Sequence, residues 1–176
     1  MIDLTVVLRA RGDSRRLRDS LRALGDQTLP ATRVEVVIVG DGAARAAAFA
    51  DEVPFVLRIG DLPGATPAEG ATGWLHLARG RYCLFLDDDV AASPGLLSAH
   101  VDAHGGREDT IVLGRISPAA AAHALVRYVV EQCDQDRRRA AEGGPAPRFV
   151  DCEWGNLSAP SAALRDAAQG ADGLRR

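Results

Sequence analysis

The chain has 176 residues, of which 24 are acidic and 21 basic, and its formal net charge is -3. This near balance argues against a general electrostatic attraction to nucleic acid or to an anionic membrane surface. An apolar fraction of 47% is enough to fill the core of one domain. The three cysteines, Cys83, Cys133 and Cys152, form no zinc-binding pattern, and no segment approaches the ~20 apolar residues of a membrane span. We therefore expect a soluble, cytoplasmic protein with reduced thiols.

The first half of the chain alternates strand patterns with helical patterns. Buried strands are expected at "IDLTVVLRA" (2–10), "RVEVVIVGDG" (33–42), "PFVLRIGD" (54–61) and "RYCLFL" (81–86), which are short apolar runs rich in β-branched residues. Helices are expected over 13–27, where leucines recur at helical spacing, and over 67–80. This alternation predicts an α/β fold with a mostly parallel sheet, helices on both faces, and ligands at the carboxyl ends of the strands.

The second half of the chain is less regular. Its pattern predicts a helix over 93–104, a strand at 110–116 and a longer helix over about 119–139. The Gly/Pro-rich segment 141–148 is expected to be a loop that leads into a short strand at 148–153. This loop is too short to be a domain linker, so we expect one domain over residues 1–176.

Asp87, Asp88 and Asp89 follow the strand at 81–86 directly. Because side chains alternate along a strand, Asp87 and Asp89 are expected to converge while Asp88 points elsewhere. Two converging carboxylates favour a hard cation, Mg²⁺ or Mn²⁺, which would in turn bridge phosphate oxygens. A solvated acidic turn or a helix cap is an equally open interpretation of this string by itself.

Four strings in order resemble family 2 glycosyltransferases of the GT-A (Rossmann-like) fold. They are "TVVLRARGDSRRLRDSLRALGDQTLP", "RVEVVIVGDG", "LARGRYCLFLDDDV" and "WGNLSAPSAAL". The resemblance implies a nucleotide-diphospho-sugar donor bound by residues 1–90 through Mg²⁺ or Mn²⁺, and a hydroxyl acceptor bound by residues 91–176. It implies these roles: Asp41 at the nucleoside base, Asp88 at the ribose and diphosphate, Asp89 at the metal, and Trp154, Gly155 and Asn156 at the acceptor side. Alternation along the strand adds Asp87 to the expected metal ligands and substrate-binding residues.

The chain departs from the family pattern at several positions. Arg9 and Arg11 lie where the family has a Pro-Thr-Tyr-Asn type of string, so an arginine replaces the aromatic contact with the base. The family's acidic pair after "GNLS", which supplies the general base, has no counterpart in this sequence. Asp151 and Glu153 lie near the acceptor string, but we leave the base unassigned. We expect the isolated chain to bind donor while transferring sugar slowly or not at all.

Other interpretations remain open. A noncatalytic nucleotide-sugar binder, or a subunit completed by a partner or by a second copy, would also fit the missing base. A sugar-phosphate nucleotidyltransferase is less favoured, because Gly12 is the sole glycine in the segment that would cradle a triphosphate. His100 and His104 are four residues apart on an expected helix, but no third metal ligand has matching spacing, so we expect them on a solvated face.

Overall fold

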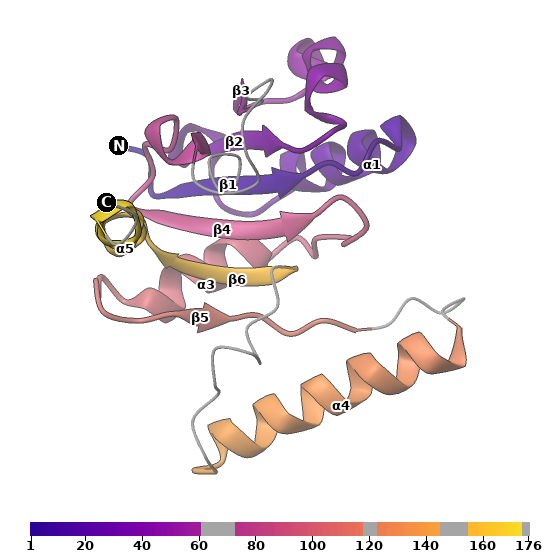
Figure 1. Ribbon diagram of the computed structural model, residues 1–176. Coiled ribbons are helices and arrows are strands. Elements are labelled where there is room, and N and C mark those ends of the chain that lie inside the picture. The colour runs from indigo at the N-terminus through magenta and orange to yellow at the C-terminus, as the bar shows by residue number, and fades with distance from the viewer. Residues whose placement is uncertain (61–72, 118–122, 145–154, 174–176) are drawn as a thin grey trace.

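The computed structural model describes residues 1–60, 73–117, 123–144 and 155–173. Among these residues, a six-stranded sheet has the order β3-β2-β1-β4-β6-β5 and is flanked by helices (Figure 1). The strands are β1 Leu4–Arg9, β2 Val34–Val39, β3 Val56–Ile59, β4 Tyr82–Asp87, β5 Val112–Leu113 and β6 Asn156–Pro160. The helices are α1 Ser14–Gly25, α3 Leu96–His104, α4 Ala124–Ala141 and α5 Ser161–Gly173, with 3₁₀ segments η1 Ala31–Arg33, η2 Ala43–Glu52 and η3 Gly73–His76.

The sheet is mostly parallel, as the sequence predicts. β1 pairs in parallel with both β2 and β4, and β2 pairs in parallel with β3. β6 is antiparallel to β4 and to β5. The predicted strands at 2–10, 33–42 and 81–86 are therefore confirmed as β1, β2 and β4, while β6 is a strand that the sequence pattern does not predict.

Helices cover both faces of the sheet, which confirms the predicted layers. On one face, α1 contributes a row of leucines and α3 contributes Leu97 to a core with alternate side chains of β1, β2 and β4. On the other face, Trp74 and Leu75 of η3 pack with Phe85 of β4, and Leu164 of α5 lies against this second cluster. Each central strand is buried on both sides because its apolar run supplies both clusters.

Several predicted elements differ from the structure. β3 was expected to be as buried as its neighbours, but it forms an edge on which Val56 and Ile59 are exposed. The helix expected over 67–80 is wrong in its described part, where η3 forms one short 3₁₀ segment. The strand expected at 110–116 is limited to Val112–Leu113. The strand expected at 148–153 lies outside the described residues.

α4 lies beyond β5, apart from the sheet (Figure 1). Its first turns expose the apolar side chains Leu125, Val126, Tyr128 and Val129. An ion pair of 3.0 Å between Arg115 Nε and Asp134 Oδ1 joins the helix to the segment after β5. None of the described helices is long and apolar enough to cross a membrane.

Glu35 is a buried acidic side chain near the start of β2, with an exposed fraction of 1%. Its Oε1 accepts hydrogen bonds from Thr5 Oγ1 at 2.7 Å and from the main-chain nitrogen of Arg79 at 2.5 Å. Its Oε2 accepts from Arg58 Nε at 3.2 Å. Both carboxylate oxygens are thus satisfied inside the protein, which ties β1, β2, β3 and the segment before β4 together.

Candidate functional site at the ends of β1 and β4

β1 and β4 are neighbours in the sheet, although β2 and β3 come between them in the chain. After β1, the strands β2 and β3 are added on one side of β1, and β4 is then added on the other side. Such a point of reversal leaves a crevice at the carboxyl ends of the two strands, where α/β proteins bind their ligands. Arg9 and Asp87 are paired residues at this edge.

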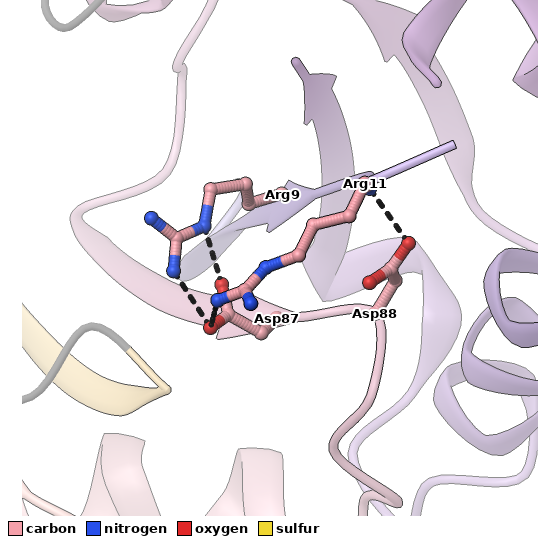
Figure 2. A network of polar contacts seen from close by, with 4 residues as sticks. All are labelled: Arg9, Arg11, Asp87 and Asp88. Carbon is pink, nitrogen blue, oxygen red and sulfur yellow. Dashed lines mark hydrogen bonds and ion pairs between the residues drawn. The ribbon is translucent and has the colours of Figure 1, made fainter. Parts of the chain in front are cut away.

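Four of the residues that the sequence indicates lie in one network at this edge (Figure 2). Arg9 donates from Nε to Asp87 Oδ1 and from Nη2 to Asp87 Oδ2, both at 2.7 Å. Arg11 Nη2 donates to the same Oδ2 at 2.8 Å. The hydrogen bond to Asp87 raises the pKa of Arg9, although partial burial opposes this, so the guanidinium stays charged. Asp87 is therefore already neutralised by two cations.

Asp88 lies beside this network and is buried, with an exposed fraction of 3%. Its Oδ2 accepts a hydrogen bond from the main-chain nitrogen of Arg11 at 2.8 Å. Its main-chain oxygen accepts from Ser20 Oγ at 3.0 Å, which fixes the chain against α1. Its Oδ1 is buried and has no hydrogen-bond partner among the described residues. Because an unpaired buried carboxylate oxygen is costly, this atom is the best candidate for contact with a ligand.

Asp89 is exposed, unlike the two aspartates before it. With Asp88 it borders a cleft of about 410 Å³ between α1 and the segment after β4, lined by Arg16, Asp19, Ser20, Ala23, Asp88, Asp89, Val90 and Ala91. This volume lies within the range of small-ligand sites, about 300 to 1,000 Å³. Asp88 and Asp89 are thus neighbours on the wall of one cleft of ligand size.

Asp41 follows β2 in a tight turn against the end of β1. Gly40 has a φ of +95°, and a Cβ at this position would lie 2.8 Å from the carbonyl oxygen of Ala10, so the turn requires glycine. The main-chain nitrogen of Gly42 donates to the same carbonyl oxygen at 3.2 Å. Asp41 itself is exposed at this edge, and its predicted role at the base stays a prediction.

Asn156 lies at the start of β6, opposite Leu86 and one residue from the aspartates. Its side chain is buried: Nδ2 donates to the carbonyl oxygen of Arg115 at 3.0 Å, and Oδ1 lies 2.8 Å from His100 Nε2. The predicted acceptor-side role of Asn156 stays a prediction. Because both polar atoms of its side chain have partners inside the protein, such a role would consist of positioning the start of β6. Gly155 is partly buried beside it, while Trp154, Asp151 and Glu153 lie outside the described residues.

The expectation that His100 and His104 lie on a solvated face is wrong. Their exposed fractions are 2% and 0%, and both rings face β6. Ser158 Oγ lies 2.7 Å from His100 Nδ1 and 2.8 Å from His104 Nε2. The missed signal is the spacing of Leu97, His100 and His104, which places all three on the buried stripe of α3.

The hydrogen bonds define one neutral arrangement of protons in this cluster. Since Asn156 uses its oxygen toward His100, His100 Nε2 carries hydrogen and His100 Nδ1 accepts from Ser158. Ser158 can then accept from His104 Nε2. Burial lowers the pKa of both histidines; a hydrogen bond with Asn156 opposes this at His100, and the neighbouring His100 adds to it at His104.

This cluster predicts acid sensitivity. Unfolded histidine has a pKa of about 6.5, so below that pH the unfolded chain binds more protons than the folded one. The stability present above about pH 6.5 should be lost as the pH falls through the lower, folded-state values. Urea unfolding at about pH 7.5 and 5.5 measures this. The loss should shrink in His100→Gln/His104→Gln and persist in His76→Gln, an exposed control; an equal loss in all three proteins would contradict it.

Solved structures define the class of fold. S. aureus TarS (residues 1–349) in complex with UDP aligns with a TM-score of 0.65 and 14% identity, covering 94% of this chain and 49% of that one. The mannosyltransferase PcManGT from Pyrobaculum calidifontis, in complex with GDP-Man and Mn2+, aligns with a TM-score of 0.68 and 17% identity, covering 93% and 46%. Glucosyl-3-phosphoglycerate synthase from Mycobacterium tuberculosis, in complex with UDP, gives 0.55 and 17%, covering 92% and 57%. The chain therefore has the GT-A fold.

A match of the sequence to a family model shows which family the chain belongs to. Residues 5–154 match the model of glycosyl transferase family 2. This match covers most of the chain, which belongs to that family. A search of curated proteins found no match. The chain spans about half the length of the solved relatives described above.

Proposed function

We propose that this protein binds a nucleotide-diphospho-sugar at the ends of β1 and β4 and transfers the sugar to an acceptor hydroxyl. The observation that carries the proposal is the buried Oδ1 of Asp88, which no described residue hydrogen-bonds, at the point where the sheet reverses direction. Family membership and the UDP and GDP-Man in structures of the same fold support the same class of donor.

The donor set at this edge fits a divalent cation. The described residues contain no group of three or more His, Cys, Asp or Glu side chains placed to hold a metal ion. Mg²⁺, however, is usually held by one or two carboxylates together with substrate phosphates. Asp88 Oδ1, which has no partner in the part of the chain that the structure describes, and the exposed Asp89 would hold the ion, which would neutralise charge on the leaving diphosphate. The role of Asp87 as a further metal ligand stays a prediction. Both its oxygens accept hydrogen bonds from arginines here, which argues against that role.

Different residues would bind different parts of the donor. Asp41 would contact the nucleoside base, and Asp88 would contact the ribose and diphosphate region. Asn156, held by His100 and by the carbonyl of Arg115, would fix the start of β6 beside this site. The acceptor hydroxyl must lose its proton as it attacks the anomeric carbon, and the base for this step is unassigned.

The test is calorimetric titration of UDP and GDP, first with Mn²⁺ and then with a chelator. We expect tighter binding with Mn²⁺ and loss of most of that difference in Asp89→Asn, about tenfold or more in affinity, because one charged partner is removed. Asp102→Asn, an exposed substitution on α3, is the matched control and should bind like the parent. Absence of binding to both nucleotides in both conditions would contradict the proposed function, and equal affinity with and without Mn²⁺ would contradict the metal.

A further inference from the structure

The phosphate site of many α/β proteins, the N-terminus of the first helix, is already occupied by a carboxylate in this chain. Asp13 caps α1, and its Oδ1 accepts hydrogen bonds from the main-chain nitrogens of Arg15 at 2.9 Å and Arg16 at 3.3 Å. A diphosphate at this position would find these donors already used by Asp13 and would be repelled by its negative charge. Positive charge for a diphosphate must therefore come from side chains or from a bound cation.

Arg9 and Arg11 offer that charge at the crevice between β1 and β4. Their side chains have exposed fractions of 43% and 55%, whereas that of Asp87 is 11% exposed. Nη1 of Arg9, and Nε and Nη1 of Arg11, have no partner among the described residues. The two partly exposed guanidinium groups therefore keep several N–H donors available, while their bonds to Asp87 hold them in place.

Asp87 holds both arginine side chains in place through hydrogen bonds. One of its oxygens accepts from Arg9 and the other from both arginines, at 2.7 to 2.8 Å. A cation on this carboxylate would have to displace two guanidinium groups that are oriented by short, charge-assisted bonds. The two arginines and Asp87 together carry a net positive charge, and arginine forks match phosphate oxygens in pairs.

We propose that Arg9 and Arg11, held in place by Asp87, form a diphosphate-binding pair that acts without a cation on Asp87. This inference rests on the proposed function for the identity of the diphosphate, which would belong to the donor. A divalent ion held by Asp88 and Asp89 would then supply further positive charge to the same diphosphate. Asp87 then serves as a positioning residue, and the arginines contact phosphate rather than the nucleoside base.

Inorganic pyrophosphate with a chelator present is the direct probe, because it carries neither base, sugar nor metal. We expect the parent protein to bind it and Arg11→Gln to bind it about tenfold more weakly, with a loss of about 100-fold in Arg9→Gln/Arg11→Gln. Arg107→Gln, which removes an exposed arginine in the loop after α3, is the matched control and should leave the affinity unchanged. Arg11→Gln retains the pair between Arg9 and Asp87, so its fold should be intact; a circular dichroism spectrum like that of the parent verifies this.

The outcomes separate this inference from the proposed function. Absence of pyrophosphate binding by the parent, or equal binding by the double variant, would overturn the arginine pair. The same would follow if UDP or GDP bound tightly to both parent and double variant, although the proposed function would then stand. Pyrophosphate binding that requires the arginines, with no gain from the nucleoside of UDP or GDP, would support the pair and count against a nucleotide-sugar donor.

Discussion

Replacing Asp88 by alanine should weaken the binding of UDP or GDP in the presence of Mn²⁺ by about 10- to 100-fold. The expected size follows from hydrogen bonds to charged groups, which contribute about 1.5 to 3 kcal/mol. Asp88 combines two properties that no neighbouring carboxylate shares: it is 3% exposed, and one of its oxygens is buried without a partner among the described residues. Calorimetric titration measures the effect, and Asp102→Asn, an exposed substitution on α3 away from this cleft, is the control.

Asp88→Asn then distinguishes a cation from a hydroxyl group as the partner of Oδ1. If the asparagine keeps its oxygen on the main-chain nitrogen of Arg11, its NH₂ group occupies the position of Oδ1. An NH₂ group can donate to a hydroxyl oxygen but cannot ligate a metal ion. Affinity like that of the alanine variant would indicate the cation, and near-parental affinity would indicate the hydroxyl. Full affinity in the alanine variant would show that Oδ1 meets no ligand at all.

Replacing Glu35 by alanine should lower the free energy of unfolding by about 3 kcal/mol or more. The change removes the acceptor for Thr5, for the main-chain nitrogen of Arg79 and for Arg58 in one step. Buried donors left without a partner cost about 1 to 3 kcal/mol each, and breaking a buried ionic contact costs about 3 to 5 kcal/mol. Urea unfolding at neutral pH measures the change.

Glu35→Gln is the matched variant, since it keeps one oxygen for Thr5 and Arg79 while placing an NH₂ group toward Arg58. It should lose clearly less stability than the alanine variant. A free energy of unfolding in Glu35→Ala within about 0.5 kcal/mol of the parent, the range of ordinary surface substitutions, would contradict the structural role assigned to this side chain.

The central strands could be predicted because their apolar runs are dictated by burial on both faces. The runs at 33–42 and 81–86 form β2 and β4, and the carboxyl end of β4 carries the aspartates as expected. The prediction that Asp87 and Asp89 converge while Asp88 points elsewhere fails, because strand geometry ends before Asp88. β4 ends at Asp87, and the main-chain nitrogen of Val90 donates to the oxygen of Asp87, which closes a turn. Asp88 therefore lies buried beside the arginines, while Asp89 points to solvent.

The environment of α3 could not be read from local pattern alone. The spacing of His100 and His104 places them on one face of a helix, but their partner Ser158 comes from a distant part of the chain. β6 is a short strand that contains Asn156, Ser158 and Pro160, a composition that strand propensities disfavour. Its pairing with β4 depends on tertiary context, so periodicity could indicate that the two histidines are buried but could not identify Asn156 and Ser158 as their partners.

The position of β6 in the sheet also constrains the order in which the strands can pair. Among the described residues, β5 is joined to the sheet only through β6, which follows it in the chain after the whole of α4. β1 to β4 can pair with one another as soon as they are made, since no later strand lies between them. β5 must wait for β6 to add to β4, and closing so long a loop is slow and entropically costly. Until then β5 has no strand partner, and α4 exposes Leu125, Val126, Tyr128 and Val129 even in the folded structure, so we expect this region of the nascent chain to be prone to aggregation.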